Sequence, residues 1–174
     1  RLTETDWNLT VNATPIPQSV QADSFHMYTL ANGIINGSSL IHFDISGAPL
    51  DTLEFSVPAE YRNIEFTGED VRNWSQTGDR YVVTLQSPII GAYSLLATFE
   101  RSFTDAADSL TATGITPLNT ASEQGTIVIC SNRQIQLSDH ADSNDLVQLT
   151  PEELSAEKRL LIQQPVIAAF QFTQ

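Results

Sequence analysis

The stretch Tyr93-Ser94-Leu95-Leu96-Ala97-Thr98-Phe99-Glu100 alternates apolar and polar side chains, and only Leu96 breaks the pattern. Leu53-Glu54-Phe55-Ser56-Val57 repeats the alternation. Because successive side chains of a β-strand point to opposite faces, both stretches predict strands with one buried face and one face in water. We therefore place six side chains in a hydrophobic core: Leu53, Phe55, Val57, Tyr93, Leu95 and Phe99.

Shorter runs of the same kind occur along the whole chain, and residues that tolerate positive φ separate many of them. These separating residues include Asn32-Gly33, Asn36-Gly37, Ser46-Gly47 and Thr77-Gly78-Asp79. Strands spaced in this way are typical of antiparallel sandwiches and barrels. We predict an all-β protein, a large antiparallel β-sandwich of about twelve strands.

One short helix is predicted near residues 151–160. Thr150-Pro151-Glu152-Glu153 places a capping residue before a proline, with a glutamate three residues after the cap, which is the pattern of a capping box. The apolar run that follows is short, so we expect about two turns and no helical layer.

The chain length suits one domain over residues 1–174, because 174 residues can bury a sizeable core. The alternation is interrupted over Thr104-Asp105-Ala106-Ala107-Asp108. A split near residues 102–109 into two β subdomains is therefore the alternative.

The charge balance narrows the choice of partners. The chain has 21 acidic and 8 basic residues, for a formal net charge of −13. Nucleic acid binding needs a basic face, so we predict no nucleic acid partner. No run approaches the length of a membrane span, so we predict no direct membrane insertion by this segment.

Three searches for chemistry end without an assembled active site. His26, His42 and His140 lack the spacing of a metal site, and Cys130 sits among apolar strand residues, which is typical of an inert core thiol. The adjacent acidic pairs Glu69-Asp70 and Glu152-Glu153 lie where a turn and a helix start explain them. We predict no catalytic residues and no enzymatic activity.

Two binding hypotheses remain open. The acidic loop around Asp139, Asp142 and Asp145 carries the oxygen ligands that calcium prefers, so a structural calcium ion is the one cofactor that we retain. Trp7 and Trp74 are candidate stacking platforms for a glycan, although tryptophans more often cover the edge of a core.

The order of strands and turns over Asp51 to Arg101, including Leu53-Glu54-Phe55-Ser56-Val57-Pro58 and Asn73-Trp74, resembles β-rich modules in large membrane-anchored envelope proteins of bacteria. Gln124-Gly125-Thr126-Ile127-Val128-Ile129 is similar to the way in which such modules continue. The resemblance implies a location outside the cytoplasm, in the periplasm or at the cell surface, within a larger membrane-anchored or secreted protein. It transfers no site residue.

Together these patterns predict a non-catalytic structural or protein-interaction module of a bacterial envelope or secreted protein. Its partners would be other domains of the parent protein or other envelope proteins. The alternative is a carbohydrate-binding module attached to an enzyme, with a glycan as its ligand. The chain begins with Arg1 rather than Met, which we interpret as a boundary within a longer protein.

Overall fold

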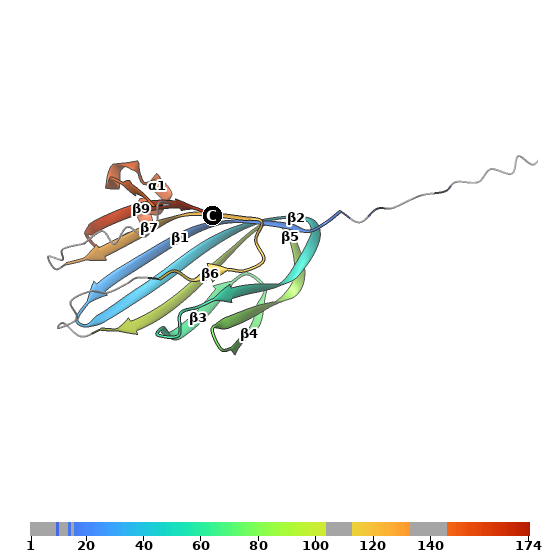
Figure 1. Ribbon diagram of the computed structural model, residues 1–174, viewed down its shortest axis with the longest axis horizontal. Coiled ribbons are helices and arrows are strands. Elements are labelled where there is room, and N and C mark those ends of the chain that lie inside the picture. The colour runs from blue at the N-terminus through green and yellow to red at the C-terminus, as the bar shows by residue number, and fades with distance from the viewer. Residues whose placement is uncertain (1–9, 11–13, 15, 104–112, 133–145) are drawn as a thin grey trace, which may run out of the picture.

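A computed structural model of the chain describes residues 10, 14, 16–103, 113–132 and 146–174 (Figure 1). Strands dominate these residues, as the alternating patterns predict. The strands are β1 (Ser19–Ala31), β2 (Ile34–Ser56), β3 (Arg62–Gly68), β4 (Val71–Thr77), β5 (Arg80–Ser102), β6 (Thr116–Pro117), β7 (Ser122–Ser131), β8 (Val147–Leu149) and β9 (Val166–Thr173). A 3-10 turn (Pro151–Glu153) and the helix α1 (Ala156–Leu161) lie between β8 and β9.

All nine described strands belong to one sheet, with the order β3-β5-β2-β1-β7-β9-β8, to which β4 adds at β5 and β6 at β2. The pairings are antiparallel except for β1 with β7, which is parallel from Gln21↔Ser122 to Leu30↔Ser131. Because β7 pairs directly with β1, residues before and after the 104–112 segment share the same sheet.

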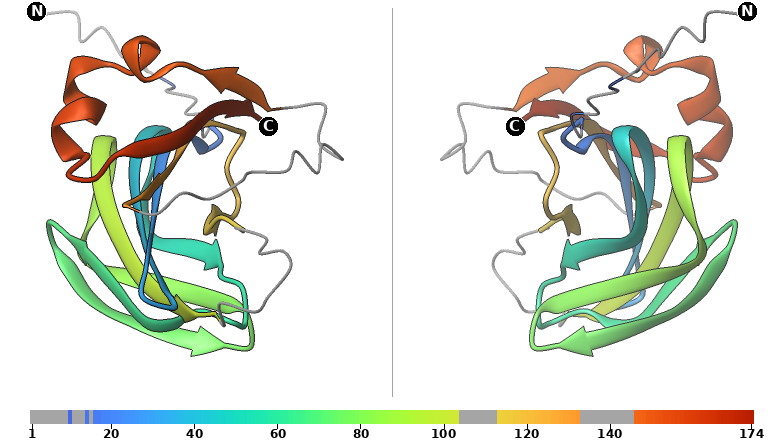
Figure 2. Two further views of the ribbon diagram at one scale, coloured as in Figure 1. Left: turned by 90° about the vertical axis from the view of Figure 1, so that its left-hand side faces the viewer. Right: turned by 90° about the vertical axis from the view of Figure 1, so that its right-hand side faces the viewer.

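Two long strands bend and fold the sheet onto itself. The first half of β2 pairs with the second half of β5, from Ile34↔Ser102 to Ile45↔Gly91, and the remaining halves pair from Thr52↔Thr84 to Ser56↔Arg80. At the bend the register shifts, and Gly47 and Gly91 have φ angles of 81° and 88°, which glycine adopts without a steric penalty. Figure 2 shows the folded-over half, with β4, lying across the rest of the sheet. The fold is thus sandwich-like, with no closed barrel.

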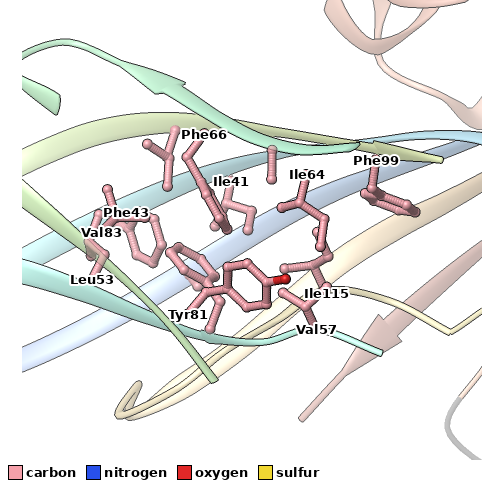
Figure 3. Close-up of a cluster of buried hydrophobic side chains, with 14 of the residues drawn as sticks. Ile41, Phe43, Leu53, Val57, Ile64, Phe66, Tyr81, Val83, Phe99 and Ile115 are labelled. Carbon is pink, nitrogen blue, oxygen red and sulfur yellow. The ribbon is translucent and has the colours of Figure 1, made fainter. Parts of the chain in front are cut away.

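The main core lies between the two halves of this folded sheet, and we call the sheet face toward it the inner face (Figure 3). Phe55 is fully buried there, 5.2 Å from the ring of Phe66 and 6.3 Å from that of Phe43. The six core residues predicted from the alternation are all buried, which confirms that prediction.

A second, smaller core lies on the opposite, outer face, where the segment around α1 covers β1, β7 and β9. It contains Phe25, Val128, Cys130, Leu154 and Ala169. The Lys158 Nζ donates a hydrogen bond to Thr126 Oγ1 at 2.9 Å and lies 3.7 Å from Asp23 Oδ1. In the described part of the chain, the outer face is thus covered over these three strands, near one edge of the sheet.

Two predicted turns need correction. Leu40 to Ile45 lies in the same bent strand as Leu53 to Ser56, because positive φ at Gly47 gives a bend where we expected a turn. Asn36-Gly37 is also no turn. Gly37 lies inside β2, where a Cβ atom would overlap the Phe99 ring.

The predicted helix is present, but it is broken into two short pieces. Thr150 and Glu153 make the predicted reciprocal contact, since the Thr150 backbone N–H donates to Glu153 Oε2 at 2.7 Å. Leu154 then leaves helical geometry and turns its side chain into the outer core. Burial of this leucine therefore takes precedence over continuing the helix.

Candidate functional site

The predicted site residues divide between the described and undescribed parts of the chain. Trp7 and the calcium candidates Asp139, Asp142 and Asp145 lie outside the described residues, so those hypotheses stay predictions. In the described ranges, no group of three or more His, Cys, Asp or Glu side chains is placed to hold a metal ion.

Trp74 covers the edge of the main core. Its ring lies 5.6 Å from Tyr81 and 6.0 Å from Phe66, and the residue stays 40% exposed. Trp74 lies opposite Val83 in the β4–β5 ladder, which directs it to the inner face. One side of the indole is therefore occupied by aromatic neighbours, and only the remaining surface is open to a ligand.

A hydroxyl–imidazole pair lies inside the sheet. Ser39 Oγ is 2.7 Å from His26 Nδ1, and the imidazole stacks on Phe172 at 5.8 Å between ring centroids. Ser39 is 0% exposed and His26 is 3% exposed. Burial in these apolar surroundings lowers the pKa of His26 from 6.5 to about 4, so the ring is neutral at pH 7.

A second buried polar pair lies on the same inner face. Ser24 Oγ donates a hydrogen bond to Glu123 Oε1 at 2.6 Å. Glu123 is held at the start of β7, where its backbone exchanges two hydrogen bonds with Gln174. Burial raises the pKa of the Glu123 carboxyl above its ordinary value, and the Ser24 hydrogen bond opposes this rise.

The two buried polar pairs and the phenols of Tyr28 and Tyr61 form a polar strip that runs toward Phe99. Both phenols donate to the Thr113 carbonyl oxygen, the Tyr28 Oη at 3.1 Å. Burial raises the pKa of Tyr28, and Tyr61 raises it further. The strip thus fixes the segment that begins at Thr113 over the inner face.

The Ser39–His26 pair has the residue types of a nucleophile and its base, but its position gives it a structural role. Catalysis requires space for a substrate next to the reacting hydroxyl. Ser39 lies in the middle of β2 with no exposed surface. The pair instead satisfies two polar groups that the sheet buries.

An exposed row on the outer face brings together Asp23, His42 and Ser94, since Asp23↔His42 and His42↔Ser94 are cross-strand partners. Ser94 Oγ is 2.7 Å from His42 Nδ1. Asp23 is engaged elsewhere, because its carboxylate accepts from Gln124 Nε2 at 3.2 Å and pairs with Lys158. These residues do not line either of two surface hollows in the described part of the chain.

The first hollow lies two rows further along the outer face and has a volume of about 440 Å³. The ladders place Met27, Ser38, Thr98 and Glu65 in one row across β1, β2, β5 and β3, and place Thr29, Asn36 and Glu100 in the next row. Asn63 closes the second row and donates from Nδ2 to Glu100 Oε2 at 2.7 Å. We call this hollow the outer groove.

The groove exists because short side chains lie beside long ones. Ser38 and Thr98 occupy the centre of its first row, whereas Leu40 and Leu96 are cross-strand partners in the adjacent row. The short side chains of the serine and the threonine extend less far from the sheet than those of the two leucines and of the two glutamates, Glu65 and Glu100. The result is a polar floor with carboxylates at one end, next to the row that contains Leu40 and Leu96.

A second hollow, of about 330 Å³, lies at the bend of β5. Glu69, Asp70, Ile90 and Tyr93 are among its lining residues. Tyr93 Oη donates to the Glu69 carbonyl oxygen at 2.6 Å, and Ile90 is 58% exposed. This hollow follows from the same bend that folds the sheet.

Sequence reasoning missed the outer groove. Each strand that lines it shows ordinary alternation, and no motif links Ser38 with Thr98 or Glu65. The only signal is the series of small polar residues on the outward face of two predicted strands. Strand order and register are needed to bring that series together.

No protein-family model matches the chain, and no curated protein matches it. Among solved structures, a two-domain M1 zinc metallopeptidase bound to L-tryptophan is similar, with a TM-score of 0.50 and 14% identity over 90% of this chain and 39% of that chain. An M1 zinc metallopeptidase from Deinococcus radiodurans bound to a Tyr-Ser-Ala substrate gives a TM-score of 0.48 and 13% identity over 90% of this chain and 38% of that one. At these identities the likeness is one of fold, and this chain spans less than half of those chains.

None of the helices in the described part of the chain has the length and hydropathy to span a membrane.

Cys130 is buried in the outer core, and burial raises the pKa of its thiol. A thiol in this state is a poor nucleophile.

Proposed function

We propose that this chain is a non-catalytic structural or protein-interaction module of a bacterial cell-envelope or secreted protein. The observation that supports this best is where the polar residues lie. The buried Ser39–His26 and Ser24–Glu123 pairs are enclosed by the sheet. The accessible polar groups are spread over an outer sheet face, as in a recognition surface.

The chain length of the structurally similar proteins supports this proposal. The similar metallopeptidase chain is more than twice as long as the part that this chain matches. We propose that this chain likewise belongs to a longer protein, and that any chemistry of the parent lies in another of its domains. Partners would then be those domains or other envelope proteins.

Activity assays on the purified chain test the non-catalytic part of the proposal. We expect no turnover of ester, peptide or glycoside substrates above the rate of a Ser94→Ala and His42→Ala double variant, which removes the one exposed Ser–His pair described above. Added zinc should leave that result unchanged. Turnover that depends on His42, or turnover that appears with zinc, contradicts the proposal.

A carbohydrate-binding module is the second candidate, and the partial exposure of Trp74 favours it. Titration with soluble polysaccharides, followed by tryptophan fluorescence, tests this candidate. A Trp74→Phe variant separates its signal from that of Trp7. A saccharide-induced change that disappears in Trp74→Phe would favour the carbohydrate-binding alternative.

A further inference from the structure

We propose that the outer groove docks an extended basic segment of a partner protein, with arginine or lysine side chains facing Glu65 and Glu100. This inference rests on the protein-interaction function proposed above, and it names the surface and the chemistry of the partner. The ladders that align the groove cross four strands, which corresponds to about 14 Å at the usual strand spacing.

The two groove carboxylates, those of Glu65 and Glu100, form no ion pair with another described residue. Among the described residues, Glu65 has no hydrogen-bond or ion-pair partner, and Glu100 accepts only from the Asn63 amide. The nearest cation along β3, Arg62, directs Nη1 to the carbonyl oxygens of Ala59 and Tyr61. The carboxylates are therefore available to pair with a cation supplied from outside.

The row of leucines beside the groove suits the aliphatic part of a basic side chain. Leu40 and Leu96 are half-buried and run parallel to the row that ends in Glu65. Arginine and lysine bury their aliphatic stems on apolar surface while their charged heads stay hydrated. A stem lying along the leucines would bring its head to the carboxylate end of the groove.

The hydroxyl and amide groups of the floor suit the main chain of the partner. Thr29, Asn36 and Ser38 present donors and acceptors across β1 and β2. Such groups match peptide N–H and C=O groups without demanding a particular side chain. The groove thus combines general contacts to an extended backbone with a specific demand for positive charge.

The net charge of the whole molecule also favours a cationic partner. A net charge of −13 steers a cationic partner toward the surface and repels an acidic one. This long-range attraction is not site-specific, so a test must separate it from docking in the groove.

The test uses a blocked Gly-Arg-Gly-Arg-Gly peptide as the probe and amide chemical shifts of the intact chain as the readout. We expect saturable shifts at residues 36–38, 63–65 and 98–100, which weaken as salt is added. The Glu65→Gln and Glu100→Gln double variant should weaken binding about tenfold, since an exposed ion pair contributes up to about fivefold.

A charge-matched control removes two exposed carboxylates outside the groove, Asp44→Asn with Asp51→Asn, and should change the affinity less than twofold by the same reasoning. Equal weakening by both double variants would show attraction by net charge alone and would overturn the groove assignment. Shifts confined to another surface, or stronger groove shifts with a neutral saccharide than with the peptide, would also overturn it. Catalytic turnover in the assays above would instead remove the proposed function and leave peptide docking measurable.

Discussion

At the scale of single residues, two aromatic side chains of the main core make close ring contacts. Phe55 contacts rings from both β2 and β3, and Phe99 stacks on Tyr61 at 4.2 Å. Both residues are at most 2% exposed. Phe55 therefore joins the two halves of the folded sheet, whereas Phe99 packs β5 against the residue that precedes β3.

Phe55→Ala and Phe99→Ala should each lower the free energy of unfolding by about 3–5 kcal/mol, through lost burial and the cavity left behind. Leu160→Ala is the control, because Leu160 is 84% exposed. That change should stay within about 0.5 kcal/mol. Urea denaturation measures all three, and similar losses for Phe55→Ala and Leu160→Ala would contradict the core assignment.

His26 predicts a loss of stability in mild acid. Its pKa is about 4 in the folded chain and near 6.5 when unfolded, so the unfolded state binds the extra proton first as the pH falls. Stability is fully present above about pH 6.5 and declines by about 1.4 kcal/mol per pH unit until about pH 4. The raised pKa of Glu123 acts with the opposite sign, because it favours the folded state at lower pH.

The comparison of wild type with His26→Gln isolates this effect, because Glu123 is common to both. The wild type should lose about 3 kcal/mol more than His26→Gln between neutral pH and pH 4, measured by urea denaturation at each pH. His42→Gln is the surface control, because it removes an imidazole on the exposed outer face. Identical pH profiles for wild type and His26→Gln would contradict the burial of a neutral imidazole.

At the scale of elements, α1 is too short to be stable by itself and depends on its contacts with the sheet. None of the residues of α1 is buried. Ser155 caps the helix by accepting a hydrogen bond from the Lys158 backbone N–H at 3.3 Å. Lys158 then crosses to β1 and β7, where its Nζ also lies 5.9 Å from the centre of the Phe25 ring.

Lys158→Met should loosen α1 while leaving the sheet intact. The side chain of Lys158 is 27% exposed and that of Asp23 is 45% exposed, so solvent weakens their attraction. We expect a loss of about 0.5–1 kcal/mol in global stability. Hydrogen exchange should accelerate at 156–161 and stay unchanged in β2. Arg159→Met is the matched control, and an equal effect from it would contradict the role of Lys158.

At the scale of the whole molecule, one sheet connects the two cores. β1 carries Phe25 toward the outer core and Tyr28 toward the inner core, and β7 joins it in parallel. β1 lies before residue 104 and β7 lies after residue 112, and we keep the single domain as a prediction. The alternative split near 102–109 would cut this pairing.

A common unfolding transition is therefore expected for both cores. Phe55→Ala weakens the inner core and Val128→Ala weakens the outer one, and both residues are 0% exposed. Each variant should shift one transition seen alike by tryptophan fluorescence and by circular dichroism. Two separate transitions, each sensitive to only one variant, would show two independent subdomains.

Features that depend on near neighbours in the chain could be predicted from the sequence alone. Alternation at Leu53-Glu54-Phe55 and Tyr93-Ser94-Leu95 indicated which faces are buried, because strand geometry repeats every two residues. The capping residues at Thr150 located the start of the helical segment, and composition fixed the acidic character of the chain. These properties need no knowledge of strand order.

Which strands pair, and what their outward side chains form together, could be seen only in the folded chain. From the sequence, the bend at Gly47 could not be distinguished from a turn, because glycine adopts positive φ in both. Ser38, Thr98 and Glu65 became one groove only through the register of β2, β5 and β3. Ladder hydrogen bonds form between backbones whatever the side chains are, so register depends on the packing of the whole core rather than on any local motif.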